Sequence, residues 1–259
     1  MKNLARYKTI AIKAALKSGC FIKRSVGRVA EISYKGRDNI VTNVDKAAEA
    51  MIVKMILGAF PGHSILAEET GSKPTASAYK WVIDPLDGTT NFAHAFPFFC
   101  VSIALEYRGK LTLGVVYDPM REELFSAEAG KGAYLNRKRI AVSATRKLSD
   151  GFLATGFSYG ITAKDGNIRN FKNLLVRSLA IRRAGSAALD MCYVACGRFD
   201  GFWEMGLHPW DSAAGTLIVR EAKGMVTRFD GSRYTPYHKD VMATNGHIHN
   251  QLSKVLSSK

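Results

Sequence analysis

An apolar strand that delivers two carboxylates into a tight turn constrains this chain more than any other feature. Residues 81–92 read WVIDPLDGTTNF. Asp84 and Asp87 lie three positions apart with a stiff proline between them, so their oxygens can converge on a hard cation. Residues 88–90 resemble a helix N-terminus, where free backbone N–H groups favour a phosphate. A β-turn with threonine N-capping also explains the Asp-Gly-Thr step, but it gives no reason for two acids at a strand end.

Three further acidic positions lie at the ends of predicted elements. Glu68 follows the apolar run 65–67, where a solvated strand edge is the simpler interpretation. Asp45 follows Thr42 at the spacing of a capping box that opens a helix. Asp211 falls in the first turn of a predicted helix, where any carboxylate gains from the helix dipole. Each position is ambiguous when it is taken alone.

Hydrophobic periodicity predicts a layered arrangement of helices and strands. An apolar stripe at i, i+3, i+4 spacing predicts a helix over residues 43–59, with Lys46, Glu49 and Lys54 on its polar face. The other predicted helices are 4–27, 167–180, 186–197, 209–223 and 246–257. The predicted strands are 64–67, 80–83, 98–107, 111–117, 123–127, 133–135, 152–155, 181–183, 202–204, 225–228 and 241–243. Hairpins dominate up to the polar stretch 143–150, and strands alternate with helices beyond it, which indicates a layered sandwich.

Composition adds one unusual property to an otherwise ordinary globular chain of 259 residues. The 37 Lys and Arg residues outnumber the 22 Asp and Glu residues, which gives a net charge of +15. Such a charge attracts phosphorylated metabolites, nucleic acid or an acidic protein surface. A solvated basic exterior without a specific partner explains the scattered charges equally well.

The chain shows neither a membrane-spanning pattern nor a disulfide framework. No apolar run approaches the roughly 18 residues that a spanning helix needs, so we expect no membrane contact. The four cysteines lack the spacing of a disulfide scaffold or a zinc site. We therefore expect reduced thiols and a cytoplasmic protein.

Taken together, these motifs resemble the inositol monophosphatase family, the magnesium-dependent, lithium-sensitive sugar phosphatases related to fructose-1,6-bisphosphatase. The segments that carry the resemblance are VTNVD at 41–45, AEE at 67–69, DPLDGTTNF at 84–92, GSAA at 185–188, EMG at 204–206 and WDSAAG at 210–215. The resemblance implies a five-layer αβαβα sandwich that combines α+β and α/β character. It implies an N-terminal α+β subdomain, residues 1–145, with most metal ligands. A C-terminal α/β subdomain, residues 146–259, would carry the substrate pocket and Asp211.

The resemblance also implies a site for two or three Mg²⁺ ions between the halves. The implied metal ligands are Glu68, Asp84, the Leu86 carbonyl, Asp87 and Asp211. Glu68 and the Thr89 hydroxyl would orient a metal-activated water for attack on phosphorus. Asp45 would accept a hydrogen bond from Thr89 and strengthen that relay.

Substrate recognition follows from the same resemblance. The implied substrate-binding residues are Asp87, Gly88, Thr89, Thr90, Gly185, Ser186, Ala187, Glu204 and Asp211. Glu204 would accept hydrogen bonds from ring hydroxyls, whereas Ser186 is also explained as a helix N-cap. Lys35 is either a loop contributor to the metal site or an exposed loop lysine.

The implied activity is that of a phosphoric monoester hydrolase of the inositol-phosphate phosphatase type. Inositol 1-phosphate is the expected substrate, and fructose-1,6-bisphosphate and histidinol phosphate are the alternatives. Nucleotides such as 3′-phosphoadenosine 5′-phosphate are expected less, because the relatives that hydrolyse them carry longer insertions. The family implies a homodimer. Some bacterial members also bind RNA polymerase, so a transcription-antitermination factor that contacts RNA polymerase or RNA through the basic surface is the alternative from another class.

Overall fold

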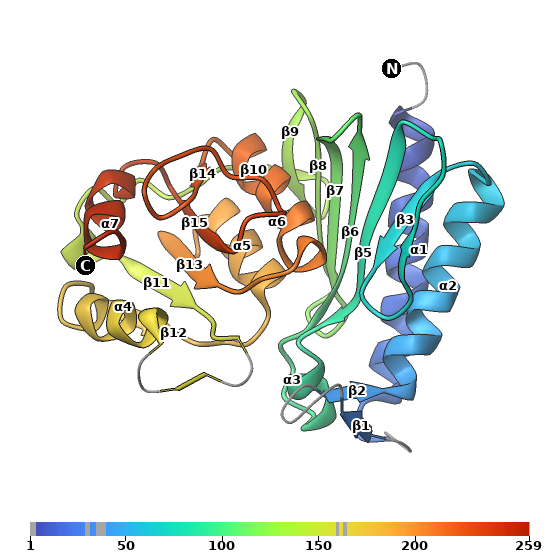
Figure 1. Ribbon diagram of the computed structural model, residues 1–259, viewed down its shortest axis with the longest axis horizontal. Helices are drawn as coiled ribbons and strands as arrows, with labels where there is room; N and C mark the ends of the chain where they lie inside the picture. Colours follow the sequence, from blue (N-terminus) through green and yellow to red (C-terminus); the bar gives the residue numbers. More distant parts are fainter. Residues whose placement is uncertain (1–3, 29–31, 35–39, 159–160, 163–164, 259) are drawn as a thin grey trace.

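The computed structural model describes residues 4–28, 32–34, 40–158, 161–162 and 165–258. Within these residues the chain forms five successive layers, helices alternating with sheets (Figure 1). The helices are α1 (Leu4–Ser25), α2 (Asn43–Ala59), α3 (Thr89–Ala93), α4 (Gly166–Leu175), α5 (Ala187–Ala195), α6 (Pro209–Glu221) and α7 (His249–Leu256), with a 3₁₀ turn, η1 (Leu148–Asp150). This arrangement confirms the predicted αβαβα sandwich.

Among the described residues the larger sheet has eight strands. In sheet order they are β10 (Lys138–Ile140), β9 (Gly132–Leu135), β8 (Glu123–Glu128), β7 (Lys110–Asp118), β6 (Cys100–Tyr107), β5 (Tyr79–Asp87), β3 (Ser64–Ala67) and β4 (Gly71–Lys73). All neighbours pair antiparallel except β3 and β5, which run parallel. The carboxyl ends of β3 and β5 therefore lie side by side.

The described part of the smaller sheet has five strands. They are, in order, β12 (Ala180–Arg182), β11 (Phe152–Thr155), β13 (Gly201–Met205), β15 (Asp240–Thr244) and β14 (Met225–Thr227). The first three run parallel and the last two join antiparallel. A separate short pair, β1 (Ile32–Tyr34) and β2 (Ile40–Thr42), precedes α2.

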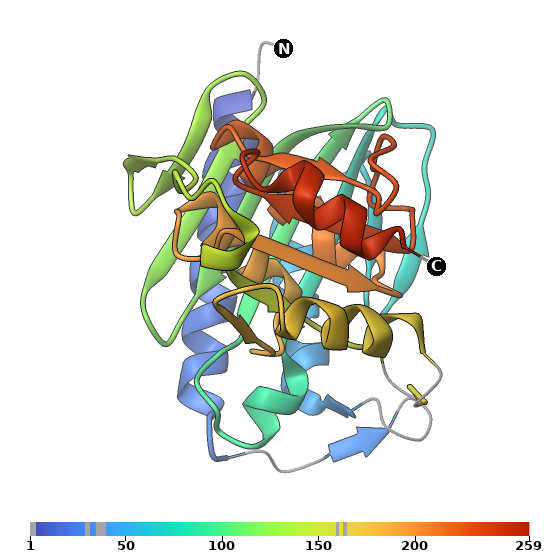
Figure 2. The ribbon, with the colours of Figure 1, turned by 90° about the vertical axis from the view of Figure 1, so that its left-hand side faces the viewer.

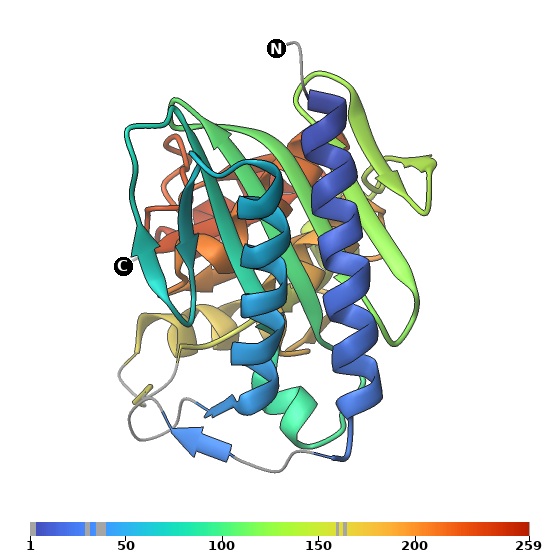
Figure 3. The same ribbon diagram turned by 90° about the vertical axis from the view of Figure 1, so that its right-hand side faces the viewer.

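The helices α1 and α2 lie side by side across one face of the larger sheet (Figure 3). Small residues on the buried side of α1 bring it close to the strands. A side chain at Gly19 would place its Cβ 2.5 Å from the ring of Tyr117 on β7. The hydrophobic core between α1 and the larger sheet therefore depends on glycine and alanine along this helix.

The helices α5 and α6 fill the space between the two sheets and share one hydrophobic core with both. A Cβ at Gly114 on β7 would lie 2.8 Å from the carbonyl oxygen of Ala214 on α6. Gly215 has a similar role, because a Cβ there would lie 2.7 Å from Met191 on α5. Segments from the second half of the chain thus pack directly on the first sheet.

The fifth layer consists of α4 and α7, which cover the face of the smaller sheet that points away from α5 and α6 (Figure 2). Trp203 on β13 is fully buried there, and its indole N–H donates to the side-chain oxygen of Asn167 over 2.8 Å. The structure corrects the predicted helix 167–180. The helix α4 ends at Leu175, and the strand predicted at 181–183 is the edge strand Ala180–Arg182, which pairs with β11.

The first sheet ends at Ile140 and the second begins at Phe152, on either side of the boundary expected at residue 145. The division into subdomains 1–145 and 146–259 stays a prediction. Among the described residues, no helix combines the length and the apolarity needed to cross a bilayer. All four cysteines are free thiols.

Candidate active site

The site is built around an irregularity at the carboxyl end of β5. Asp84 pairs with Ser102 and Asp87 pairs with Cys100, and the register shifts between the two pairs. The shift lets both carboxylates reach one cavity, whereas regular alternation would point residues three apart to opposite faces. The Leu86 amide donates to Asp84 Oδ1 over 2.9 Å. The strand is longer than the predicted 80–83 because this irregular pairing continues it to Asp87.

Gly88 turns the chain from β5 into the short helix α3. Its φ of 96° lies in the left-handed region, which favours glycine. A Cβ there would also lie 3.0 Å from the carbonyl oxygen of Phe98 and 3.2 Å from that of Gly185. The motif glycine is therefore required both by the backbone conformation and by the close approach of two other segments.

Asp45 links α2 to the Thr89 hydroxyl. Thr89 Oγ1 lies 2.8 Å from Asp45 Oδ1 and 3.0 Å from the Leu86 carbonyl. The other carboxylate oxygen of Asp45 accepts from the backbone N–H and the hydroxyl of Thr42. Burial raises the pKa of Asp45, and the hydrogen bonds from Thr42 and Thr89 oppose that rise. The Asp45 carboxylate therefore completes the capping box of α2 and also accepts a hydrogen bond from Thr89.

Glu68 follows β3 and lies next to the end of β5. Its backbone N–H donates to the Ile83 carbonyl over 3.2 Å, because β3 and β5 are parallel neighbours. The turn after it is held by Glu49 of α2, whose two carboxylate oxygens accept from the Glu69 and Thr70 amides over 2.8 Å each. The prediction that Glu49 faces solvent was wrong, since its exposed fraction is 1%. Helical periodicity could not reveal these backbone donors, which come from another segment.

Asp211 enters the same cavity from the first turn of α6. Pro209 begins that helix, and the His208 amide donates to Asp211 Oδ2 over 2.7 Å. The His208 and Trp210 rings stack with centroids 4.8 Å apart. The predicted helix-start role of Asp211 is thus confirmed, and it coexists with a place at the cavity wall.

Asp87 connects the first sheet to the start of α5. Its Oδ2 accepts from the Ser186 hydroxyl over 2.6 Å and from the Ala188 amide over 2.8 Å. Burial raises the pKa of Asp87 to about 6, and these hydrogen bonds oppose the rise. Ser186 also caps α5 by accepting from the Leu189 amide. Both interpretations of Ser186, the N-cap and the pocket wall, therefore hold.

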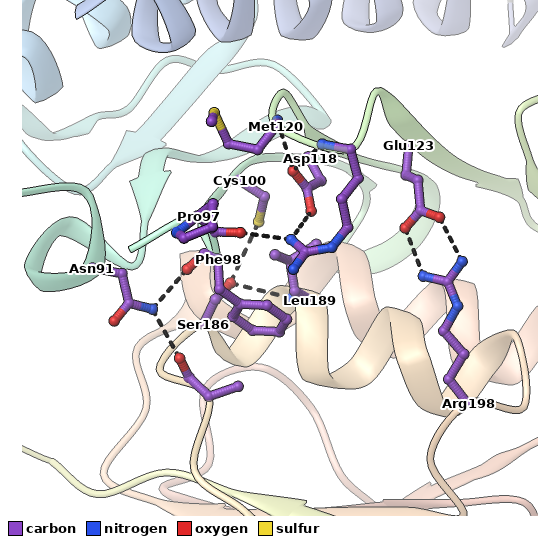
Figure 4. Close-up of polar contacts among 12 residues, drawn as sticks. Asn91, Pro97, Phe98, Cys100, Asp118, Met120, Glu123, Ser186, Leu189 and Arg198 are labelled. Carbon is purple, nitrogen blue, oxygen red and sulfur yellow. Dashed lines mark hydrogen bonds and ion pairs between the residues drawn. The ribbon is translucent and has the colours of Figure 1, made fainter. Parts of the chain in front are cut away.

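Further contacts fix the same junction (Figure 4). Asn91 donates to the carbonyls of Phe98 and Ala184 over 2.7 and 2.8 Å. Glu123 and Arg198 form an ion pair between β8 and the segment after α5 (Figure 4). The bond from Asn91 to Ala184 and the Glu123–Arg198 ion pair thus tie α3 and β8 to the second half of the chain.

A cavity of about 430 Å³ lies where these segments meet. The predicted site residues that line it are Glu68, Asp84, Leu86, Asp87, Gly88, Thr89, Thr90, Gly185, Ser186, Ala187, Glu204 and Asp211. Asp45 stands behind Thr89 instead of at the wall. Lys35 lies outside the described residues. Residues separated by more than a hundred positions are thus brought to one place, and their individual roles stay predictions.

Sequence reasoning missed several residues of the cavity wall. The polar ones are Asn91, Ser158, Arg183, Asp190 and His208. Asp190 had a recognisable signal, because it lies four positions after Ser186, one turn along the same helix. Ser158 and Arg183 carried none, since their position depends on how the smaller sheet packs.

The cavity concentrates negative charge in a buried place. Burial raises the pKa of Asp84 well above its usual range, and the charges of Glu68, Asp87 and Asp211 raise it further. Burial and Asp87 act in the same direction on the pKa of Asp211. Acids that repel one another in this way need a counter-charge to be ionised together.

The donor set fits Mg²⁺ in chemistry. As the side chains stand, no three of the described His, Cys, Asp and Glu residues form a ready-made metal-binding group. Carboxylate and carbonyl oxygens are nevertheless the ligands that hard cations take. Mutual repulsion among Asp84, Glu68 and Asp211 is the condition that a divalent cation would relieve.

Comparison with known proteins agrees with this geometry. The model of the inositol monophosphatase family matches residues 3–259. The chain is 46% identical to the inositol-1-monophosphatase of Synechocystis sp. over 99% of its own length and 90% of that protein's. It is 47% identical to the Nus factor SuhB of Pseudomonas aeruginosa, with 86% of this chain and 85% of that protein covered.

A solved structure shows the same fold. The extragenic suppressor protein suhB from Bartonella henselae superposes with a TM-score of 0.94 at 41% sequence identity. The match covers 98% of this chain and 99% of that one. The full-length family match, the two relatives and this shared fold agree with one another. The chain belongs to the inositol monophosphatase family.

Proposed function

We propose that the chain is a Mg²⁺-dependent phosphomonoesterase that hydrolyses inositol 1-phosphate or a related polyol or sugar phosphate. Membership of the family supports a phosphatase in general terms. The observation that carries the finer proposal is the convergence of Glu68, Asp84, Asp87 and Asp211 from three segments on one cavity. A single buried carboxylate would have a structural explanation, whereas four that share a cavity call for a cation.

Two or three Mg²⁺ ions would be held by Glu68, Asp84, the Leu86 carbonyl, Asp87 and Asp211. When bound, such ions neutralise these acids, lower the pKa of water and stabilise charge on the departing oxygen. Inhibition by Li⁺ belongs to the same proposal, because it follows from the family resemblance.

The chain's own groups would orient the reactants. Backbone N–H groups of Gly88 and Thr89 would receive phosphate oxygens, which need donors in a fixed place. The Thr89 hydroxyl and Glu68 would hold the attacking water in line with the phosphorus atom. Asp45 accepts from Thr89 over 2.8 Å, so it would set the direction of that hydroxyl.

The alcohol would lie on the α5 side of the cavity. Gly185, Ser186 and Ala187 offer small side chains and backbone groups there, and Glu204 would accept from ring hydroxyls. Thr90 would contribute to the phosphate end. Fructose-1,6-bisphosphate and histidinol phosphate are the alternative substrates.

Phosphate release from a panel of esters tests the proposal. Inositol 1-phosphate, fructose-1,6-bisphosphate and histidinol phosphate would each be incubated with the purified protein, with Mg²⁺ and with a chelator. We expect release that requires Mg²⁺ and is fastest for inositol 1-phosphate. Phosphate release that persists with chelator would contradict the metal assignment. A faster rate on another ester would show that this ester, and not inositol 1-phosphate, is the preferred substrate.

A second role in a transcription complex is favoured by two observations. A relative at 47% identity is called a Nus factor, and the net charge of +15 suits an anionic partner. The partner would be RNA polymerase or RNA. We expect binding to survive Asp84→Asn and to weaken steeply with salt; binding insensitive to salt would contradict the electrostatic basis.

The assembly and the compartment complete the proposal. We propose a homodimer in the cytoplasm, on the family resemblance and on the four free thiols. Light scattering of the purified chain checks the assembly, and a monomer mass would contradict it.

A further inference from the structure

Asp190 has a buried carboxylate at the wall of the cavity. The residue lies on α5 with an exposed fraction of 1%. Its Oδ1 has no hydrogen-bond partner within the described part of the chain. Two other buried side-chain oxygens share that property, those of Asn170 and Thr216, and neither residue lines the cavity. Asp190 does.

This carboxylate has no structural explanation in its own helix. The N-cap of α5 is Ser186, whose hydroxyl accepts from the Leu189 amide. A buried acceptor without a donor destabilises a fold, more so when the acceptor is a carboxylate. Apolar residues fill the neighbouring positions of α5, so a leucine at this place would suit the helix better.

The electrostatic surroundings point to the cavity. Burial raises the pKa of Asp190, and the charges of Glu204 and Asp87 raise it further. Arg183 at the cavity wall opposes these effects for both Asp190 and Glu204. Two acids therefore border one region of the cavity, and the charge of Arg183 acts on both.

The Glu204 side chain occupies space that is open because the residue opposite it is Gly156. A Cβ at Gly156 would overlap the Glu204 carboxylate, so this glycine provides the room that the glutamate occupies. Glu204 has an exposed fraction of 7% and lines the cavity from β13. The two carboxylates thus reach the cavity from different elements, α5 and β13.

We propose that Asp190 is a specificity-determining residue that, with Glu204, accepts hydrogen bonds from two hydroxyl groups of the leaving alcohol. The inference rests on the proposed phosphatase function and narrows its substrate class. The site would select monophosphates of polyols that carry neighbouring hydroxyls. A second phosphate in the same region would face two acids, so bisphosphates would be disfavoured.

The reason for selectivity is the Asp190 acceptor oxygen, which has no hydrogen-bond partner among the described residues. A site built to receive a hydroxyl discriminates strongly against an ester that lacks it, because the buried acceptor is then left unpaired. Removing the acceptor should therefore weaken binding of the polyol ester and leave binding of an ester without further hydroxyls unchanged. This difference between two substrates separates a specificity role from general damage to the site.

The test compares inositol 1-phosphate with 4-nitrophenyl phosphate, whose alcohol has no further hydroxyl. The ratio of their kcat/KM values would be measured for wild type, Asp190→Asn and Asp190→Leu. We expect the ratio to fall at least about tenfold in Asp190→Leu, mainly through a higher KM for inositol 1-phosphate. The fall should be smaller in Asp190→Asn, which keeps one acceptor oxygen in a side chain of the same size.

Thr216→Val is the matched control, since it removes a buried unpaired oxygen away from the cavity wall. Its ratio should equal that of the wild type. Thermal unfolding gives a second measurement, because a structural Asp190 would lower Tm on replacement. We expect the Tm of Asp190→Leu to equal or exceed the wild-type value.

The outcomes separate this inference from the proposed function. A wild-type enzyme that hydrolyses inositol 1-phosphate, together with a variant ratio within about twofold of the wild-type ratio, overturns the role of Asp190 alone. Equal losses on both substrates with a lower Tm overturn it as well, since they indicate a structural residue. A wild-type chain that releases no phosphate with Mg²⁺ overturns the proposed function and this inference with it.

Discussion

The Ser186 hydroxyl donates to Asp87 Oδ2 over 2.6 Å, across a separation of 99 positions in the sequence. This bond joins the end of β5 in the larger sheet to the start of α5. The Ala188 amide donates to the same oxygen over 2.8 Å. One carboxylate therefore fixes the relative position of the acidic segment and the proposed alcohol pocket.

Replacement of Ser186 by Ala should affect stability and binding together. The variant loses both the bond to Asp87 and the cap of α5, so we expect the free energy of unfolding to fall by about 1–2 kcal/mol. We also expect a higher KM for inositol 1-phosphate. Urea unfolding and steady-state kinetics measure the two effects. Ser186→Thr keeps the hydroxyl and should retain most of both; a Ser186→Ala enzyme with wild-type stability would contradict the linkage.

Replacement of Asp84 by Asn should separate catalysis from folding. We expect Mg²⁺-dependent phosphate release below about 1% of the wild-type rate, since Asp84 is a proposed Mg²⁺ ligand. The fold should remain, because the substitution is isosteric and removes a buried charge that Glu68, Asp87 and Asp211 repel. Tm should therefore equal or exceed that of wild type. Asp150→Asn, at an exposed position outside the cavity, is the control. Substantial Mg²⁺-dependent turnover by Asp84→Asn would refute the metal assignment.

The hydroxyl of Thr89 should matter more than its methyl group. Thr89→Val removes the donor to Asp45, and we expect kcat to fall about 100-fold, within the range of a lost general acid–base contact. Thr89→Ser keeps the hydroxyl and should stay within about tenfold of wild type. Single-turnover phosphate release measures both. Equal losses in the two variants would contradict the prediction that the hydroxyl matters more than the methyl group.

Glu49 should stabilise the turn that carries Glu68. In Glu49→Ala the amides of Glu69 and Thr70 lose their acceptors, so we expect a loss of about 1–3 kcal/mol in the free energy of unfolding. The concentration of Mg²⁺ for half-maximal activity should rise, because Glu68 is then less well positioned. Denaturant unfolding and a Mg²⁺ titration measure these effects. Glu49→Gln keeps one carbonyl acceptor and should lose less, and an unchanged Mg²⁺ titration in Glu49→Ala would contradict the positioning role.

His249 should make stability depend on pH. Burial lowers its pKa below the usual value of 6.5, and its ring nitrogens contact the Thr227 and Thr244 hydroxyls. The unfolded chain binds the proton more readily, so stability should be complete above pH ~6.5 and decline as pH falls towards the lower folded pKa. Chemical unfolding at pH 7.5 and pH 5.5, on wild type and His249→Gln, isolates this contribution. A wild type and a variant with the same pH dependence would contradict it.

Local pattern was sufficient for much of this protein. The apolar stripe of residues 43–59 predicts α2, the capping box predicts Thr42 as its N-cap, and the acidic strand end at Asp84 and Asp87 predicts the site. Each of these features depends on contacts between residues that are close in the sequence. The periodicity of apolar residues and the spacing of motifs therefore reveal them. The prediction failed at the end of α4. The helix ends at Leu175, and the Leu179 amide donates to the Gly151 carbonyl of another segment instead of continuing the predicted helix to residue 180.

The sequence by itself determined the motifs, the predicted layers and the family resemblance, because these are properties of neighbouring residues. Tertiary structure alone decided that Glu49 is buried under the Glu68 turn, that Ser186 reaches Asp87, and that Asp190 lines the cavity with an oxygen unpartnered among the described residues. Each of these facts requires two segments far apart in the chain to meet. Such meetings depend on how whole sheets and helices pack, and no local spacing specifies them.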